Sequence, residues 1–407
     1  MIGNPALRGS RVESSAVAPT SPSFPKDLQT PTTVESNSVT PMRHLAGLDG
    51  VRAIAILIVV AYHTLQNVPR PTFAQNLVLH VAAQGWVGVD LFFVLSGFLI
   101  TGILLDSRGR DHSLQTFYVR RVLRILPVYV AYLLFSLFLG VRLGGMHADE
   151  VIQLHRNQGW FWSYSVNILI ALRSWKASGF SMTHLWSLSV EEQFYVLWPL
   201  VVLWTTPATV RRVAIGCVIA AEVFRLIFIL AGVGAQVNFF LLPTRMDTLA
   251  AGAFLACAFR DARLWMRVLR ARKPVLIASV SILAAIMVYR HTIAIQEPLE
   301  QLLAYPALVG LASVVVCSAC VSTGWLSNGI LRFVAKISYG MYVWHIMILR
   351  HVLESALLPD SGSPQLMWLY YAKILFAAIA GTIVIATLSW YVIEQPFLRL
   401  KRFVPYA

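Results

Sequence analysis

The sequence predicts an all-α, polytopic integral membrane protein with about ten transmembrane helices and one short re-entrant or interfacial helix. The composition is the first reason, because 57% of the residues are hydrophobic and only 13% are charged, whereas soluble domains carry about 25% charged residues. The second reason is length, since many apolar runs reach the ~20 residues that cross a bilayer as a helix. The third is that Lys and Arg lie mostly in short loops between these runs, as membrane orientation requires.

We place the ten spans at residues 49–67, 85–105, 122–141, 186–204, 213–232, 243–259, 275–290, 302–322, 336–353 and 367–393. A further apolar piece, Trp160 to Leu172, is too short to cross comfortably and fits a re-entrant or interfacial helix. Counting it as a full span would put the basic run at 260–273 outside, against the positive-inside rule. Ten spans place both the N- and the C-terminus in the cytoplasm.

The two ends of the chain differ from its apolar body. Residues 1–42 are rich in Ser, Thr and Pro, so we expect a disordered cytoplasmic tail before a membrane domain at 43–397 and a basic cytoplasmic tail at 398–407. The net charge of +14 then indicates orientation and no nucleic-acid partner. The four cysteines lie in apolar segments without a zinc-ligand pattern, so neither a metal nor a permanently bound cofactor is expected.

The first span, GLDGVRAIAILIVVAYH, carries Arg52 near its cytoplasmic end and His63 in its outer half. Eleven residues separate them, which is about 16 Å and three full turns, so both point to one face of the helix. Ionisable groups inside a span usually face the bundle interior or a wet cavity. The structural alternatives are an arginine that extends to the headgroups and a histidine that bonds a backbone carbonyl.

The second span enters from outside and brings Asp90 to about the depth of His63. Asp90, Val94, Gly97 and Thr101 form one small, partly polar helical face, suited to close packing or to a passage. A buried carboxylate beside a histidine fixes its tautomer and stabilises its protonated form. The pattern therefore predicts an acid–base pair of His63 and Asp90, with a capping or structural aspartate as the alternative.

Two further groups complete the predicted site. HLWSLSVEEQFYVLWPL begins outside at His184 and carries Glu191 and Glu192 two turns into its span, where at least one carboxylate should face inward. At the cytoplasmic start of the third span, Arg121 and Arg124 lie three residues apart beside Arg120. Planar guanidinium groups suit phosphate oxygens, although such a cluster can also act only as a topological signal.

Other charges within the spans have structural explanations. Glu222 and Arg225 are three residues apart in mid-span and are expected to pair with each other. Arg245 and Asp247, near the outer start of a span, either pair with each other or touch an acceptor.

Six motifs in order, from GLDGVRAIAILIVVAYH through GVDLFFVLSGFLIT, RRVLRILP, HLWSLSVEEQFYVLWPL and SYGMYVWH to YVIEQPF, resemble the membrane-bound acyltransferase family 3. These are bacterial O-acyltransferases that acetylate O-antigens, exopolysaccharides, nodulation factors and some macrolides. The family's Arg, ten residues, His pattern maps onto Arg52 and His63, and its RxxR motif onto Arg121 and Arg124. Many members carry a fused extracytoplasmic hydrolase-like domain, whereas here a stand-alone membrane domain is expected.

The resemblance implies an O-acetyltransferase of the cell (inner) membrane that moves an acyl group from cytoplasmic acyl-CoA, a co-substrate, to a hydroxyl of a carbohydrate or glycolipid. His63, oriented by Asp90, is the expected general base. The donor-binding residues are Arg52, Arg120, Arg121 and Arg124, and the acceptor-side residues are His184, Trp186, Glu191 and Glu192. The expected partners are the bilayer, acyl-CoA and the carbohydrate acceptor. Nothing in the sequence specifies the oligomeric state.

Two alternatives belong to other functional classes. Ten spans with interior His, Asp, Glu and Arg also suit a proton-coupled exporter of a sugar or lipid, although the two halves show no internal repeat of the kind common in transporters. A catalytically idle relative that binds polysaccharide intermediates is the other, and the intact Arg52, His63, Arg121 and Arg124 argue against it.

Overall fold

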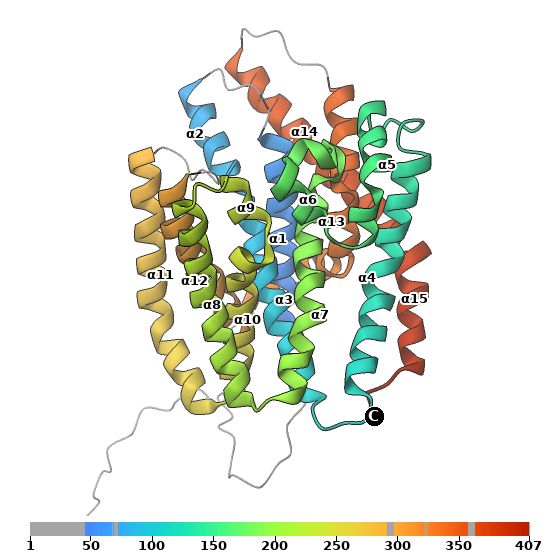
Figure 1. The fold of residues 1–407 in the computed structure, drawn as a ribbon. Helices are drawn as coiled ribbons and strands as arrows, with labels where there is room; N and C mark the ends of the chain where they lie inside the picture. The colour runs from blue at the N-terminus through green and yellow to red at the C-terminus, as the bar shows by residue number, and fades with distance from the viewer. Residues whose placement is uncertain are drawn as a thin grey trace, which may run out of the picture. The chain divides into compact units, whose positions relative to one another are not determined.

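The computed structural model describes residues 45–66, 68, 72–290, 297–321, 324–356 and 363–406, and in these residues every regular element is a helix (Figure 1). The predicted N-terminal tail, residues 1–42, lies outside the described residues. The all-α prediction is therefore confirmed for the part of the chain that the structure describes.

Each of the ten predicted spans coincides with a helix. These helices are α1 (Ala46–Leu65), α3 (Val87–Asp106), α4 (Ser113–Phe138), α7 (Trp186–Trp204), α8 (Pro207–Leu230), α10 (Leu242–Phe259), α11 (Ala262–Arg290), α12 (Pro298–Val321), α13 (Gly329–Ser355) and α14 (Pro364–Ser389). Among the described residues, seven helical stretches are long and apolar enough to cross a membrane, and they include α1, α3, α4, α8, α11, α12 and α14.

The other three helices, α7, α10 and α13, also carry polar residues into the bundle interior. Glu191 lies in α7, Arg245 in α10 and His345 in α13. Nearly all of α10 is buried, and it packs between α3 and α8. The bundle thus encloses its polar helices, while helices such as α8 and α11 leave most of their apolar side chains exposed toward the surroundings.

The small face predicted on α3 is a close packing surface against α10. A Cβ atom added to Gly97 would collide with the carbonyl oxygen of Leu249, and one added to Gly252 would collide with that of Val94. Small residues at helix interfaces let backbones approach in this way inside a membrane. At the end of the same face, Thr101 Oγ1 accepts a hydrogen bond of 2.8 Å from Trp198 Nε1 of α7.

The short apolar piece at Trp160–Leu172 is not one helix. α5 (Ala148–Trp162) ends and α6 (Val166–Arg173) begins within it, and Tyr164 between them adopts a left-handed φ of +50°. Two 3₁₀ turns, Trp175–Ser178 and Phe180–Leu185, then lead into α7 and carry His184 into the bundle. A bilayer is not part of the structure, so the interfacial or re-entrant placement of this segment stays a prediction.

Two short helices in predicted loops were not expected. α2 (Phe73–Ala82) begins at a capping box in which Thr72 and Gln75 bond each other's backbone N–H groups, a Thr-x-x-Gln signal present in the sequence. α9 (Ala235–Phe240) leads into α10 and brings Phe239 and Phe240 into the core.

The predicted C-terminal tail packs against the bundle. After α14 the chain makes one π turn (Trp390–Glu394), then α15 (Gln395–Arg399) and a 3₁₀ turn (Leu400–Phe403). In Figure 1 α15 runs alongside α4 toward the end of the bundle where α3 and α4 connect. We call this the C-terminal end. A cytoplasmic location of this end stays a prediction.

Candidate active site

A cavity of about 420 Å³ lies between α1, α3, α4, α7, α13 and the C-terminal segment. Its lining is asymmetric in chemistry. Toward the C-terminal end it is cationic, and away from it the lining consists mainly of apolar and hydroxyl side chains from α3, α7 and α13. The cationic residues are Arg52, Arg120, Arg121, Arg124 and Lys401, and the single carboxylate in the lining is Glu191. The four arginines predicted as donor ligands therefore surround one cavity.

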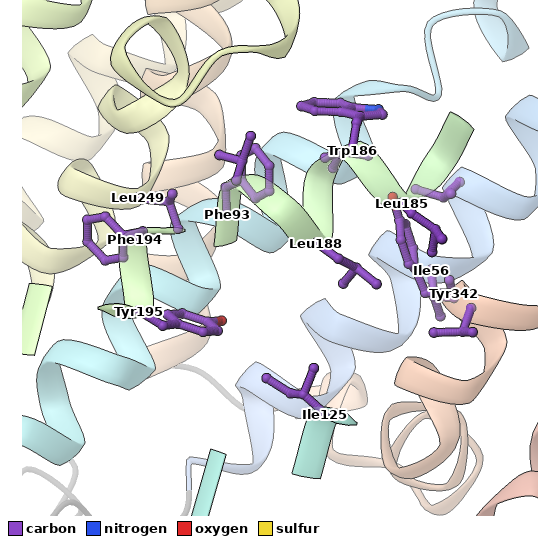
Figure 2. Packing of buried hydrophobic residues seen from close by; sticks show 14 of the residues in the cluster. Ile56, Phe93, Ile125, Leu185, Trp186, Leu188, Phe194, Tyr195, Leu249 and Tyr342 are labelled. Carbon is purple, nitrogen blue, oxygen red and sulfur yellow. The ribbon is translucent and has the colours of Figure 1, made fainter. Parts of the chain in front are cut away.

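Aromatic rings and hydroxyl groups position the central part of this wall. The Arg121 guanidinium lies 5.4 Å from the Tyr195 ring centre and 5.5 Å from that of Phe117, distances at which cation–π attraction holds an arginine in place. The Tyr195 hydroxyl in turn is hydrogen-bonded to Ser96 of α3. Figure 2 shows Tyr195 and Leu188 projecting from α7 toward Ile125 of α4, on the side where the cavity lies.

Three histidines meet on one side of the cavity's apolar part. His63 comes from α1, His345 from α13 and His184 from the turn before α7. The ring centres of His63 and His345 are 4.9 Å apart, and those of His345 and His184 are 5.1 Å apart. His184 and His345 are buried, whereas His63 is only half-buried, so His63 is the member that a reactant can approach most readily.

The hydrogen bonds assign a tautomer to His63. Its Nδ1 lies 3.0 Å from the Val59 carbonyl oxygen, and because a carbonyl only accepts, Nδ1 carries the proton. His345 Nδ1 likewise donates to the Tyr342 carbonyl oxygen at 2.6 Å, which leaves His345 Nε2 as an acceptor. That Nε2 lies 3.3 Å from His63 Nδ1 and shares its proton. The neutral His63 ring therefore has its lone pair on Nε2, the atom that can take up a proton.

Tyr342 connects the cavity to the histidines. It lines the cavity, its ring centre is 5.6 Å from that of His345, and its hydroxyl donates to the His184 carbonyl oxygen at 2.8 Å. His63 itself is not part of the cavity lining. Contacts through Tyr342 and His345 therefore link the cavity lining to His63.

The structure does not pair Asp90 with His63. Asp90 is buried and forms an ion pair with Arg245 of α10, whose guanidinium lies 5.0 Å from the centre of the Tyr305 ring and 5.3 Å from that of Phe239. The predicted depth of Asp90 tells nothing about which neighbour it faces. The face that includes Gly97 contacts α10 and not α1, so Asp90 meets an arginine there.

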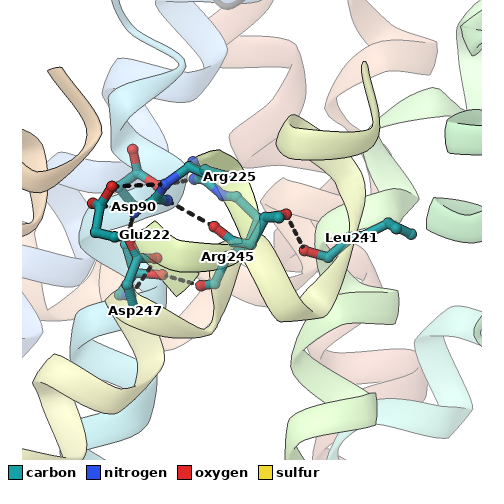
Figure 3. A network of polar contacts seen from close by, with 8 residues as sticks. Asp90, Glu222, Arg225, Leu241, Arg245 and Asp247 are labelled. Carbon is teal, nitrogen blue, oxygen red and sulfur yellow. Dashed lines mark hydrogen bonds and ion pairs between the residues drawn. The ribbon is translucent and has the colours of Figure 1, made fainter. Parts of the chain in front are cut away.

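Asp90 is part of a larger polar network (Figure 3). Arg225 pairs with Glu222, as predicted, and also with Asp247 at 2.7 Å. It further donates to the Thr244 carbonyl oxygen at 2.7 Å. Arg245 and Asp247 therefore do not pair with each other. The network joins α3, α8 and α10, and its buried charges have partners of opposite sign.

The residues predicted on the acceptor side separate into different environments. Trp186 is 6% exposed, and its ring packs against Phe93, Phe239 and Phe240, so it belongs to the core and presents no free face to a sugar. Figure 2 shows it among the buried apolar side chains. Glu191 faces the cationic cavity and not an outer mouth, whereas half-buried Glu192 is outside the cavity lining.

His345 is the site residue that the sequence argument did not use. Both α1 and α13 begin at the C-terminal end, and His63 and His345 each lie about 16–17 residues after their helix begins. At 1.5 Å per residue these positions have nearly equal depth, which is a signal that the sequence contains. Among the described residues, no group of three His, Cys, Asp or Glu side chains is arranged to hold a metal ion.

The fold and the site define a class of protein: a helical membrane bundle with a cationic cavity next to a cluster of histidines. The chain belongs to the acyltransferase family whose model, described as an acyltransferase domain, matches residues 45–387. No solved structure matches the chain.

Named relatives extend the comparison. Peptidoglycan O-acetyltransferase OatA of Listeria monocytogenes is 30% identical over 384 residues, which are 89% of this chain and 57% of the relative. A protein of Staphylococcus aureus (strain COL), provisionally named an O-acetyltransferase, is 30% identical over 380 residues, 88% of this chain and 58% of the relative. The chain thus spans less than three fifths of the length of these relatives.

Proposed function

We propose that this protein is a membrane O-acetyltransferase that uses acyl-CoA, most simply acetyl-CoA, to acylate a carbohydrate hydroxyl. The observation that supports this most directly is the cationic cavity, whose lining residue Tyr342 contacts the histidine cluster that includes His63. One bundle interior then holds both cationic groups suited to phosphate and a base. Family membership supports acyl transfer, and the relative named for peptidoglycan supports a carbohydrate acceptor. Family membership also favours an enzyme over a proton-coupled exporter.

The donor enters from the C-terminal end, which faces the cytoplasm under the positive-inside rule. Its phosphates cannot enter hydrocarbon without a large loss of solvation, so they stay at the guanidinium groups of Arg52, Arg121 and Arg124. The pantetheine arm follows the apolar part of the cavity past Ile100 and Leu188 and brings the thioester to Tyr342. A shift of the Tyr342 side chain then opens a path from the cavity to His63.

His63 Nε2 accepts the proton of the acceptor hydroxyl while its oxygen attacks the thioester carbonyl carbon. The carbon–sulfur bond breaks, and the leaving thiolate takes the proton back from the imidazolium as free CoA. During this step His345 Nε2 accepts the His63 Nδ1–H and stabilises the positive ring, the role that the sequence assigned to Asp90. His345 is thus a positioning residue.

The test uses the whole protein, purified in detergent without a membrane gradient. It is supplied with acetyl-CoA labelled in the acetyl group and with peptidoglycan fragments or other cell-surface glycans, and label in the carbohydrate is counted. His63→Ala should lose about 10²–10⁴-fold of the activity because a general base is removed. His80→Ala is the matched control, since its ring also bonds a carbonyl four residues earlier, at 2.8 Å, but in α2.

Two results would overturn the proposal. If His63→Ala transfers label at the wild-type rate, His63 is not the general base. If the wild-type protein never transfers label but transports a sugar or lipid, it is an exporter.

A further inference from the structure

The C-terminal segment Leu400–Tyr406 forms part of the wall of the cationic cavity. Lys401 and Tyr406 both line it, and both are half-buried there. The neighbouring Arg402 and Phe403 are exposed and lie outside the lining. The segment therefore presents one lysine side chain and one aromatic ring to the cavity.

Arginine side chains of the bundle hold this segment in place. Arg120 Nη1 donates to the Val404 carbonyl oxygen at 2.8 Å and to that of Lys401 at 3.3 Å, and Arg110 Nη1 donates to that of Tyr406 at 3.3 Å. The Arg120 guanidinium also lies 5.1 Å from the centre of the Tyr406 ring. Arg120, predicted to bind the donor, thus uses some of its N–H groups to position Lys401 and Tyr406.

The charge balance of the cavity indicates a polyanionic occupant. Five cationic side chains and one carboxylate line it, and two further carboxylates, Asp49 near Arg52 and Glu394 near Arg124, lie outside the lining, so cations still outnumber carboxylates by five to three. Partly buried charges of one sign are costly unless an ion of opposite sign joins them. Coenzyme A carries a pyrophosphate and a separate 3′-phosphate, which together need more cations than one arginine pair supplies.

We propose that Lys401 and Tyr406 complete the coenzyme site, with Lys401 binding the 3′-phosphate and the Tyr406 ring stacking on the adenine base. This inference rests on the proposed function and extends it by naming the part of the donor that the segment recognises. The pyrophosphate stays with Arg121 and Arg124 of α4. The segment therefore selects coenzyme A over carriers that have the pantetheine arm without the nucleotide.

The experiment measures the Kd of CoA, 3′-dephospho-CoA and pantetheine by titration calorimetry on the full chain in detergent, so no acceptor is needed. Lys401→Gln should weaken CoA binding about 10-fold or more, the usual effect of losing one charge-assisted hydrogen bond. It should leave 3′-dephospho-CoA unchanged. Tyr406→Ala should weaken both nucleotides about 10-fold, as loss of one base–aromatic stack does, and leave pantetheine unchanged.

Arg402→Gln is the matched control, because it removes the same charge from the same segment at an exposed position outside the cavity. An equal loss of CoA affinity in this control would mean that Lys401 acts only through non-specific electrostatic attraction of CoA, and it would overturn the inference. So would a Lys401→Gln variant that weakens CoA and 3′-dephospho-CoA alike. If Lys401→Gln does not fold, Tyr406→Ala decides the question alone, by whether it distinguishes nucleotides from pantetheine.

A lipid headgroup is the other source of phosphate, and the same titration separates it. If phosphatidylglycerol leaves the CoA affinity of the wild type unchanged, the site is a coenzyme site. If instead phosphatidylglycerol competes with CoA in the wild type but not in Lys401→Gln, and this variant binds CoA as tightly as the wild type, then Lys401 binds lipid and the inference is overturned. Failure of the proposed function looks different, since the wild type would then bind no CoA at all.

Discussion

The ion pair between Asp90 and Arg245 gives the sharpest test, because the sequence placed Asp90 in the reaction and the structure places it in a scaffold. The change is Asp90→Asn, which keeps the shape and the acceptor oxygen but removes the charge. Asp90 is 2% exposed and Arg245 is 1% exposed, so water cannot replace the lost partner. We expect a loss of stability with little direct effect on the chemical step.

The magnitude follows from the burial. Removing one partner of a buried pair leaves the other charge uncompensated and costs about 3–5 kcal/mol of the free energy of unfolding. Replacing both partners with apolar residues of similar volume, Asp90→Leu with Arg245→Met, removes both charges and should recover most of that loss. Asp261→Asn is the control, since its pair with Arg211 has side chains 47% and 37% exposed and should contribute at most about 1 kcal/mol.

Unfolding in mixed micelles with increasing denaturing detergent, followed by tryptophan fluorescence, measures these differences. Transfer activity is measured on the same samples at a temperature where every variant is folded. The reasoning is refuted if Asp90→Asn is as stable as the wild type but inactive, or if the apolar double variant regains stability and has no activity. Either result would return Asp90 to the catalytic group.

Two further predictions concern His345, which the sequence argument did not use, and Trp186, which the structure places in the core. His345→Leu should lower kcat about 10- to 100-fold and leave the KM for the donor unchanged, because it removes a hydrogen bond that is charge-assisted only while His63 is protonated; an unchanged kcat would contradict the positioning role. Trp186→Ala should lower the free energy of unfolding by about 3–5 kcal/mol, as loss of a buried aromatic ring does, while the KM for the acceptor in the transfer assay stays within about twofold; a stable variant with a much higher KM would restore the predicted acceptor-side role.

The sequence was sufficient for the ten long helices and for the cationic end of the site, but not for the short helices in the loops. Each predicted span corresponds to a helix because a run of ~20 apolar residues has few other options in a bilayer. Arg52 and the arginines of α4 could be brought together because both lie in the first turns of helices that begin at the same end of the bundle. Chain order and helix length determine the depth of each residue in the membrane, and depth was sufficient to predict that these arginines lie together.

What depth cannot supply is the identity of the lateral neighbour. Asp90 and His63 have similar depth, but α3 contacts both α1 and α10, and the face chosen depends on where Gly97 and Gly252 allow the closest approach. Trp186 was assigned to a mouth from its place at a helix start, whereas the aromatic residues of α9 cover it. That contact depends on a short helix that the hydropathy pattern does not reveal.

The link between α3 and α10 also affects how the chain is made. Asp90 emerges from the ribosome 155 residues before the arginine that neutralises it. At about 5–20 residues per second, this delay lasts roughly 10–30 s. Throughout that interval the Asp90 carboxylate lacks its counter-ion. The contact between α3 and α10 can therefore form only after synthesis has passed residue 245, whereas α1 and α3 can pack against each other earlier.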